Sequence, residues 1–548
     1  MRNRRRSSCC GLFLSVALAA WPATAAVWQR ETVVAGINGA PPGISPHGLT
    51  GIAAAGDGTL LAGSVIGPGI YRFDPKAGTV AEEIEPAAGE ADDVAVGDDG
   101  TLVWTALLAG ELRIRRPGAL PTVLAKDLPL VNPVAFAEGR LYAGQIGTHD
   151  TLLDVDAKTG AHRVLARGLG GINAFVADGA GGLFVPLAAK GAIGRFDLGT
   201  GELKIIAEGL GQPVAVKRDS QGGLFTIDWR TGRVIFVHPQ SGETKKIATV
   251  APPLDNLAIG ADDTIYVTRP VDNSIVAVDP ATGAQRIVFQ GRLAAPGGLA
   301  LTTVAGKPSL LVADAYGYRT VDLASGAVVT PPFDPPANAG SMIAATDKII
   351  AFTNVRRGSL VIVYRQTGRV RHALGGFKAP MSVVIESETS FLVADYGNGE
   401  IIRVHPGAAI ERVTVFGGLR GPVGLARRAN GELLVTEADE GTLVALDAET
   451  GGRRILAANL LQPEGLALMP DGRVAVAEVG ARRLIAYDPA GLALKPEIEI
   501  IAEDLQVGAM FTAAPAPVYL PTGVAVDAVG AIYVTCDRDN TVLKFSLK

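Results

Sequence analysis

Residues 212–248 read QPVAVKRDSQGGLFTIDWRTGRVIFVHPQSGETKKIA, and this stretch decides the fold. It contains four short runs of β-branched and other apolar residues, which are separated by turns rich in Gly, Asp and Pro. Such runs are typical of β-strands, and the turns between them are too short to hold anything but antiparallel neighbours. The stretch therefore predicts one four-stranded antiparallel meander.

The same unit recurs along the chain at a spacing of roughly 40 to 45 residues, which is typical of propeller repeats. Asp-Gly and Asn-Gly pairs such as 57–58 and 430–431 follow most of the first strands, and they favour tight hairpins because both residue types tolerate a positive φ. Twelve copies can be counted, whose first strands begin near Leu49, Val94, Val134, Phe175, Val214, Leu257, Leu299, Ile343, Val383, Leu425, Leu466 and Val524.

A single meander cannot bury both of its faces, whereas copies packed face to face around an axis can. Twelve copies in one ring would leave a wide central hole. We therefore predict an all-β chain of two six-bladed β-propellers, with twelve four-stranded blades. The first ring is assigned to residues 27–294 and the second to residues 295–548, and the Pro-rich run at 331–336 is an alternative seam.

The two ends of the chain suggest how a ring could close. The last copy stops after its third strand, near residues 542–547, and an orphan strand at 30–35 precedes the first copy. An N-terminal strand that completes the last blade would close the second ring and hide a sheet edge. Otherwise the second ring closes in some other way.

Residues 1–26 have the features of a signal peptide, with a basic start, a short apolar run at 11–20 and small residues at 23–25. A secreted or periplasmic location is therefore expected, with no membrane span after cleavage. Beyond this segment the chain keeps one cysteine, Cys536, so an internal disulfide is not possible. The formal net charge of −5 argues against nucleic-acid binding, which needs a basic surface.

In a propeller, the residues just before each innermost strand converge on the central channel. Two positions before the first apolar residue of that strand, the second ring has mostly small or apolar residues, namely Gly297, Ser341, Met381, Val423, Glu464 and Thr522. The first ring has a polar residue in every blade, namely His47, Asp92, Asn132, Asn173, Gln212 and Asp255. Polar groups confined in a channel need partners. Either ordered water satisfies them, or they bind a polar ligand or a hard cation such as Ca²⁺.

The second ring carries acidic residues at the ends of its second strands, namely Asp314, Asp395, Glu437, Glu478 and Asp537. They either cap turns or form a surface that binds a cation or a ligand. Aromatic and basic residues in neighbouring loops suit a face that binds a protein or a glycan, namely Tyr316, Tyr318, Arg319, Arg356, Arg357 and Tyr396.

The blade pattern, seen in Gln462–Ala467 with Pro470–Arg473 and in Leu392–Asn398, resembles the NHL, streptogramin-lyase and SMP-30/gluconolactonase propeller superfamily. The likeness covers nearly the whole chain after residue 26, but many functions share it. In the gluconolactonase branch, one six-bladed ring holds a divalent metal, usually Ca²⁺, on its axis. Its ligands are a Glu, an Asn and an Asp, and a further Asn helps to hold the substrate.

This resemblance implies roles for residues at the same blade spacing. Asp92, Gln212 and Asp255 would be metal ligands, with Asp255 also a catalytic base, and Asn173 would hold the substrate. Asp92 stands where the family has Glu, and Gln212 where it has Asn, so each donor oxygen moves by about one methylene. His47 and Asn132 are additional to the family pattern and are predicted to contact the substrate.

Three functions remain open from the sequence. The first is a metal-dependent hydrolase of a lactone or ester. The second is a non-catalytic NHL-like scaffold that binds a protein or a glycan, and the third is a streptogramin-type lyase. The lyase is the weakest, because no His and Glu are evident on one channel face. No Ser-His-Asp triad or His-Glu-x-x-His motif is evident.

Overall fold

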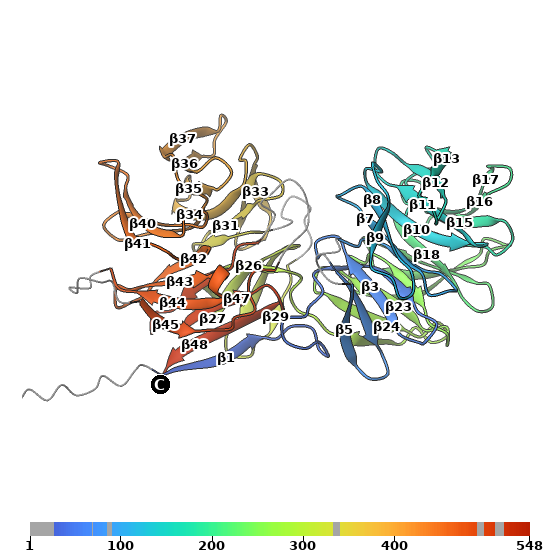
Figure 1. Cartoon of the computed structure of the whole chain (residues 1–548), viewed down its shortest axis with the longest axis horizontal. Helices are drawn as coiled ribbons and strands as arrows, with labels where there is room; N and C mark the ends of the chain where they lie inside the picture. Colours follow the sequence, from blue (N-terminus) through green and yellow to red (C-terminus); the bar gives the residue numbers. More distant parts are fainter. Residues whose placement is uncertain (1–26, 68, 85–89, 332–339, 490–497, 510–519) are drawn as a thin grey trace, which may run out of the picture.

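A computed structural model describes residues 27–67, 69–84, 90–331, 340–489, 498–509 and 520–548 (Figure 1). Almost every regular element in this part of the chain is a β-strand, and one short 3₁₀ turn, η3 (Val479–Ala481), interrupts the pattern. The strands form twelve four-stranded antiparallel sheets. The predicted signal peptide, residues 1–26, lies outside the described residues.

The blades of the first ring contain the strands β2 (Leu49–Ala54), β3 (Leu60–Ser64), β4 (Ile70–Asp74), β5 (Thr79–Ile84), β6 (Val94–Val96), β7 (Leu102–Ala106), β8 (Glu111–Arg115), β9 (Thr122–Ala125), β10 (Val131–Ala137), β11 (Arg140–Gln145), β12 (Thr151–Val155), β13 (His162–Arg167), β14 (Val176–Ala177), β15 (Gly182–Leu187), β16 (Ala192–Asp197), β17 (Leu203–Ala207), β18 (Pro213–Arg218), β19 (Leu224–Asp228), β20 (Arg233–Val237), β21 (Thr244–Thr249), β22 (Leu257–Ile259), β23 (Ile265–Arg269), β24 (Ser274–Val278) and β25 (Gln285–Phe289).

The blades of the second ring contain the strands β26 (Pro296–Val304), β27 (Lys307–Asp314), β28 (Gly317–Asp322), β29 (Val328–Val329), β30 (Ile343–Ala345), β31 (Ile349–Asn354), β32 (Ser359–Tyr364), β33 (Val370–Leu374), β34 (Pro380–Ser387), β35 (Ser390–Asp395), β36 (Glu400–His405), β37 (Glu411–Phe416), β38 (Pro422–Arg427), β39 (Leu433–Glu437), β40 (Thr442–Asp447), β41 (Gly452–Ala457), β42 (Pro463–Leu468), β43 (Val474–Glu478), β44 (Arg483–Tyr487), β45 (Ile498–Ala502), β46 (Val524–Val526), β47 (Ile532–Cys536), β48 (Thr541–Leu547) and β1 (Trp28–Val34).

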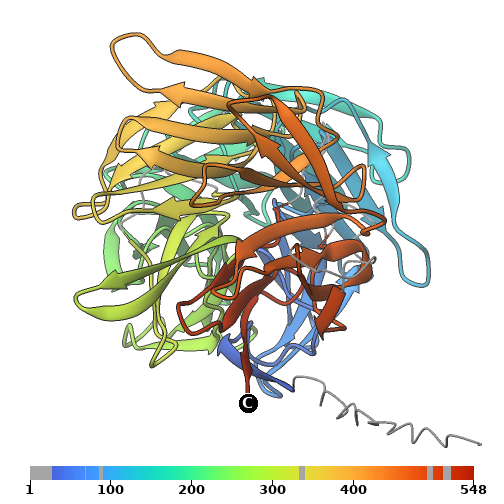
Figure 2. The ribbon, with the colours of Figure 1, turned by 90° about the vertical axis from the view of Figure 1, so that its left-hand side faces the viewer.

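The innermost strands close two separate circles. In the first ring, β2, β6, β10, β14, β18 and β22 contact one another in turn, and β22 returns to β2. In the second ring, β26, β30, β34, β38, β42 and β46 do the same. Figure 2 looks along the longest axis and shows the blades of the second ring around a centre, with the first ring behind. The predicted fold of two six-bladed propellers is therefore confirmed.

Strand β1 closes the second ring. It pairs antiparallel with β48, from Trp28 opposite Leu547 to Val34 opposite Val542, and so becomes the outer strand of the last blade (Figure 1). The chain then builds the whole first ring before it returns to the second at β26. The range 27–294 assigned β1 to the first ring, whereas its hydrogen bonds join it to the second. In the first ring, β2 contacts β22 and β23 of the last blade, and none of the described strands overlaps the two ends of the ring.

In several blades, a threonine near the end of the second strand links its own blade to the next one by hydrogen bonds. Thr268 Oγ1 accepts a hydrogen bond from the Asn256 amide at 3.1 Å within its own blade and donates to Thr50 O of the next blade at 2.7 Å. Thr353 and Thr436 bond in the same way, since Thr353 donates to Met381 O and Thr436 to Glu464 O. These hydroxyls satisfy backbone groups that the short inner strands leave unpaired near the axis.

The two rings meet at the faces where the inner strands begin. The loop before β2 is bonded to the loop between β47 and β48, because Asn540 Nδ2 donates to Ser45 Oγ at 2.9 Å and to Pro46 O at 2.8 Å. Ile66 packs with Ala294, Ala295 and Ala315 in an apolar cluster that contains residues of both rings. Since the contacting loops lie at one edge of each blade, the channel mouth of each ring opens toward the other ring.

Candidate functional site

A side-chain hydrogen bond in the first ring joins the two blades on either side of the blade of β2. Asn256 Nδ2 donates to Asp93 Oδ1 at 2.9 Å, and Asp93 Oδ2 accepts from the Val134 amide at 3.0 Å. Asp93 precedes β6 and Asn256 precedes β22, so the bond joins two blades that flank the blade of β2. Both residues are almost fully buried. The residues before the inner strands therefore meet near the axis, as the repeat predicts.

Asp92 and Asp255 lie next to this bond. Burial raises the pKa of Asp92 well above its usual range, and the Asp255 charge adds to the increase. Burial also raises the pKa of Asp255 to about 7, and the charge of Asp93 adds to that shift. Two carboxylates that share a dehydrated site resist simultaneous ionisation. The Asp255 charge therefore favours the protonated form of Asp92.

Lys217 is a charged residue inside an inner strand, at a point where an apolar residue is more usual. Its ammonium group donates to Phe175 O at 3.4 Å. Burial lowers the pKa of Lys217, and the nearby Asp93 carboxylate opposes that effect. Lys217 in turn lowers the pKa of Asp93, which burial has raised. The channel therefore holds an ammonium group against a cluster of carboxylates.

The other predicted site residues differ in position. His47 is buried at the junction of the rings, where its Nε2 bonds to the backbone oxygen of Asp537 and burial lowers its pKa to about 4. Gln212 is exposed, and its backbone amide donates to Asp228 Oδ1 at 3.2 Å. Asn173 and Asn132 are partly buried, and Asn173 Oδ1 accepts from the Ala174 amide at 2.8 Å.

Two side chains of the second ring act on this site. Tyr316, in the loop between β27 and β28, lies against Gly48 at the start of the first ring. The charges of Asp255 and Asp92, added to burial, raise the pKa of its phenol. Arg356, in the loop between β31 and β32, is close to Glu90, whose pKa burial raises to about 7. Glu90 Oε1 accepts from the Ala109 amide at 2.7 Å, and its carboxylate is buried.

The acidic residues of the second ring are turn caps. Asp314 accepts hydrogen bonds from the backbone amides of Ala294 and Ala295. The equivalent residues accept from backbone amides of their own blades: Asp395 from Lys378 and Ala379, Glu437 from Arg420, Glu478 from Leu461 and Asp537 from Ala509. All five are almost fully buried. The capping interpretation is therefore confirmed, and an acidic docking surface built from these residues is wrong.

The proposed binding face of the second ring also needs a correction. Arg319 has an exposed fraction of 0% and pairs with Asp314 at 3.2 Å, so it cannot present its charge to a partner. Tyr318 is buried as well. Arg356 and Arg357 remain exposed.

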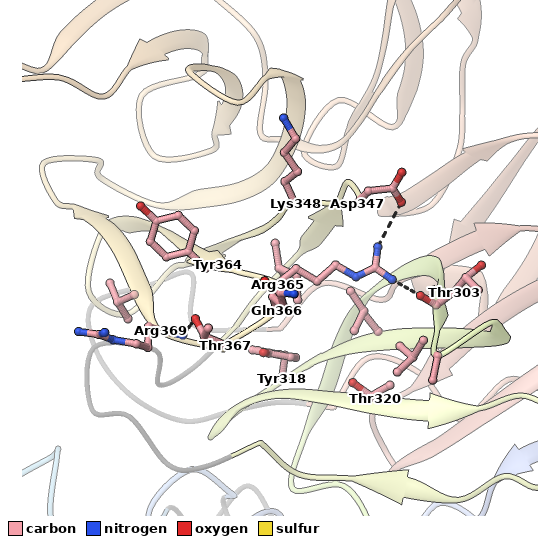
Figure 3. A pocket seen from close by; sticks show the side chains of 15 residues that line it. Thr303, Tyr318, Thr320, Asp347, Lys348, Tyr364, Arg365, Gln366, Thr367 and Arg369 are labelled. Carbon is pink, nitrogen blue, oxygen red and sulfur yellow. Dashed lines mark hydrogen bonds and ion pairs between the residues drawn. The ribbon is translucent and has the colours of Figure 1, made fainter.

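A cavity of about 1080 Å³ lies away from both axes, between the sheet of β26 to β29 and the sheet of β30 to β33 (Figure 3). Its lining includes Tyr318, Lys348, Tyr364 and Arg365. Arg365 Nη1 donates to Thr346 O at 2.9 Å, and the same guanidinium bonds to Thr303 O. Arg365 therefore ties the hairpins of two blades together.

The donors near the axis suit a divalent cation in kind. Asp92 and Asp255 supply carboxylate oxygens, which are ligands that Ca²⁺ prefers. Gln212, the third predicted ligand, is exposed, and only its backbone amide is bonded, to Asp228 Oδ1. A cation between the two carboxylates would relieve their repulsion. Among the described residues, three or more His, Cys, Asp and Glu side chains nowhere gather in a metal-binding arrangement. The predicted ligands are two carboxylates and one amide, so they do not form a cluster of three such side chains.

Sequence reasoning missed Asp93, Asn256 and Lys217. The signal was present as consecutive polar pairs, Asp92 with Asp93 and Asp255 with Asn256, before inner strands. Only one member of each pair was considered. Lys217 was visible as a charge within a β-branched run. The position of Tyr316 over the first ring depends on how the rings pack, which the repeat does not specify.

Comparison with known proteins places the chain in a family. A family model described as outer membrane protein assembly factor BamB matches residues 89–371, and the chain belongs to this family of β-propellers. A search of curated proteins finds no match. Within the part of the chain that the structure describes, no helix has the length and apolar character of a membrane span.

Solved structures similar to this chain include two extracellular domains from B. thetaiotaomicron and a lyase. The domain of the putative one component system BT4673 is 12% identical to this chain and has a TM-score of 0.31. The match covers 91% of this chain and 75% of that domain. The domain of the putative hybrid two component system BT4673 is 11% identical, with 94% and 82% covered and a TM-score of 0.32. Virginiamycin B lyase from Staphylococcus aureus is 14% identical, with 61% and 95% covered and a TM-score of 0.30.

Proposed function

We propose that this protein is a secreted or periplasmic hydrolase that opens a small lactone or ester at the axis of its first ring, with a divalent cation as cofactor. The observation that carries this proposal is the convergence of Asp92 and Asp255, whose neighbours Asp93 and Asn256 are hydrogen-bonded to each other. The blade pattern supports the finer likeness to the SMP-30/gluconolactonase branch, and the features of residues 1–26 support export.

Asp255 is the base in this proposal. A base works best when its pKa lies near the working pH, and burial brings the pKa of Asp255 to about 7. Its ionised form removes a proton from the attacking water. Asn173 holds the substrate from the fourth blade, and Asn132 contacts it farther out, whereas His47 Nε2 is already bonded to the backbone oxygen of Asp537.

Asp92, Asp255 and Gln212 would hold the cation, most suitably Ca²⁺. When bound, it would polarise the substrate carbonyl and lower the pKa of a water.

A second candidate function is a scaffold that binds a protein or a glycan. The match to the BamB family favours it, since that family is described by an assembly factor. The exposed Arg356 and Arg357 of the second ring would contribute to such a surface. The two candidates differ in whether Asp255 is needed for turnover.

Hydrolysis of a panel of lactones and aryl esters, with Ca²⁺ and then with a chelator, separates the candidates. We expect turnover that needs the cation and is abolished in Asp255→Ala. Asp262→Ala is the matched control, because Asp262 caps an exposed turn in the same blade, where Oδ1 accepts from the Thr264 amide at 3.1 Å. Equal turnover by the two variants, or none by the unmodified protein, would leave the scaffold as the better account.

A further inference from the structure

Tyr316 belongs to the second ring but lies at the channel mouth of the first. A Cβ added to Gly48 would come 2.7 Å from Tyr316 Cε2 and 3.2 Å from its hydroxyl oxygen. Gly48 has a φ of +64° and directly precedes β2. The aromatic ring therefore packs on bare backbone at the start of an inner strand, and a larger residue at position 48 would displace it.

The loop that carries Tyr316 is held from both rings. Arg319 Nη1 donates to Tyr316 O at 3.3 Å, and Arg319 Nη2 bonds to Val271 O in the first ring. On the other side, Ala315 packs with Ile66. Because Arg319 is fully buried, this arrangement is costly to rearrange, and Tyr316 has a defined position.

The chemistry around the phenol identifies what it faces. Gly48, on which the phenol packs, leads into β2, where the Gly51 amide donates to Asp92 O at 2.6 Å. The principal charged neighbours of the phenol are Asp255 and Asp92, followed by Arg356 and Asp314. Asp255 and Asp92 are the pair at the centre of the proposed site. A phenol carries one O–H group, so its hydroxyl is available as a hydrogen-bond donor.

We propose that Tyr316 completes the site of the first ring, where its hydroxyl donates a hydrogen bond to the carbonyl oxygen of a substrate held beside Asp92 and Asp255, and its ring shields that pair from water. This inference rests on the proposed hydrolytic function for the donor role, whereas the shielding rests on the position of the ring at the start of β2, the strand whose Gly51 amide bonds to Asp92 O.

Tyr316 acts in this reaction on the carbonyl oxygen of the substrate. Water oxygen bonds to the carbonyl carbon, its proton passes to Asp255, and the π pair moves onto the carbonyl oxygen, which the Tyr316 hydroxyl stabilises. The pair then returns, the bond from that carbon to the ring or ester oxygen breaks, and Asp255 gives its proton to the leaving oxygen. Removing one such donor typically lowers kcat by about 10²-fold.

Two variants of the full-length protein separate donation from shielding. Tyr316→Phe keeps the ring and loses the hydroxyl, so we expect a fall in kcat of about 10²-fold with KM nearly unchanged. Tyr316→Ala also loses the ring. The matched control is Tyr396→Phe, which removes a hydroxyl from the corresponding loop of another blade, where it bonds to Asp439 Oδ1 at 2.7 Å. Full turnover in Tyr316→Phe, or an equal loss in the control, would overturn the donor role.

Carbodiimide labelling at one fixed pH, followed by peptide mass mapping, tests the shielding without any activity. We expect labelling of Asp92 and Asp255 to rise several-fold in Tyr316→Ala and to stay unchanged in Tyr316→Phe. No rise in Tyr316→Ala, with the thermal midpoint preserved, would overturn the placement of Tyr316 over the pair. If the unmodified protein hydrolyses nothing, the proposed function fails, whereas the labelling still decides the placement.

Discussion

Asn256 Nδ2 donates a hydrogen bond to Asp93 Oδ1 at 2.9 Å, although the two residues are 163 positions apart. The bond joins the second and sixth blades across the first blade of the ring. Both side chains are almost fully buried, so neither has water as a ready alternative partner. The first ring lacks an outer strand that overlaps its ends, and this bond is one of the interactions that close it.

Asn256→Ala should therefore destabilise the first ring. The change leaves Asp93 Oδ1 buried without its donor, which costs about 1–3 kcal/mol. Thermal unfolding measures the effect, with Gln221→Ala as control, since Gln221 is in an exposed turn. Equal midpoints for the two variants would contradict a structural role for the bond.

Strand β1 should be essential to the second ring and not to the first. A chain that starts at residue 36 loses the pairing of β1 with β48 and exposes a sheet edge. Hydrogen exchange should show lost protection in β48, with the strands of the first ring unchanged. If β25, the outer strand of a blade in the first ring, lost protection equally, the claim that β1 closes only the second ring would be contradicted.

Arg319→Met should weaken the junction between the rings. The substitution removes the bond to Val271 O and leaves Asp314 buried beside a neutral side chain. Removal of one partner from a buried ion pair costs about 3–5 kcal/mol. Arg371→Met is the control, because its ion pair with Glu388 is looser, at 3.9 Å, and more exposed. If the thermal midpoint of Arg319→Met were no lower than that of Arg371→Met, the proposed role of Arg319 at the junction would be contradicted.

Glu464 should make the second ring less stable as the pH rises. Burial raises the pKa of Glu464 to about 8, whereas the same carboxyl in an unfolded chain titrates near 4.5. The folded protein binds the extra proton between these values, so the free energy of unfolding falls as pH rises through this window, by up to about 1.4 kcal/mol per pH unit.

Glu464→Gln removes the titrating group. The drop in thermal midpoint between pH 6 and pH 9 should therefore be smaller in this variant than in the unmodified protein, whereas Glu440→Gln, at an exposed position, should change nothing. A drop in Glu464→Gln as large as that of the unmodified protein would show that another group carries the pH dependence.

Much of the fold could be predicted from the sequence, because each blade is a local meander whose turns are encoded by Asp-Gly and Asn-Gly pairs. The closure by residues 28–34 was one of two alternatives that the sequence left open, since the last repeat lacks a fourth strand and the first follows an orphan one. Asp92 and Asp255 were predicted as site residues because position before an inner strand determines closeness to the axis, and their role stays a prediction.

The rest depends on contacts that the repeat does not encode. Tyr316 lies over the first ring only because of how the loops near Ser45 and Val271 pack against the second ring. From the sequence alone, the acidic residues of the second ring could equally form a ligand-binding surface. Only their bonds to backbone amides identify them as caps. His47 has the pattern of a channel residue, yet its Nε2 bonds to the second ring at Asp537.

Calorimetric titration with Ca²⁺ tests the central claim most directly, since it measures whether the centre of the first ring is a cation site. We predict one site per chain that is lost in Asp255→Asn and kept in Asp262→Asn. Absence of binding by the unmodified protein, or equal binding by both variants, would contradict the account.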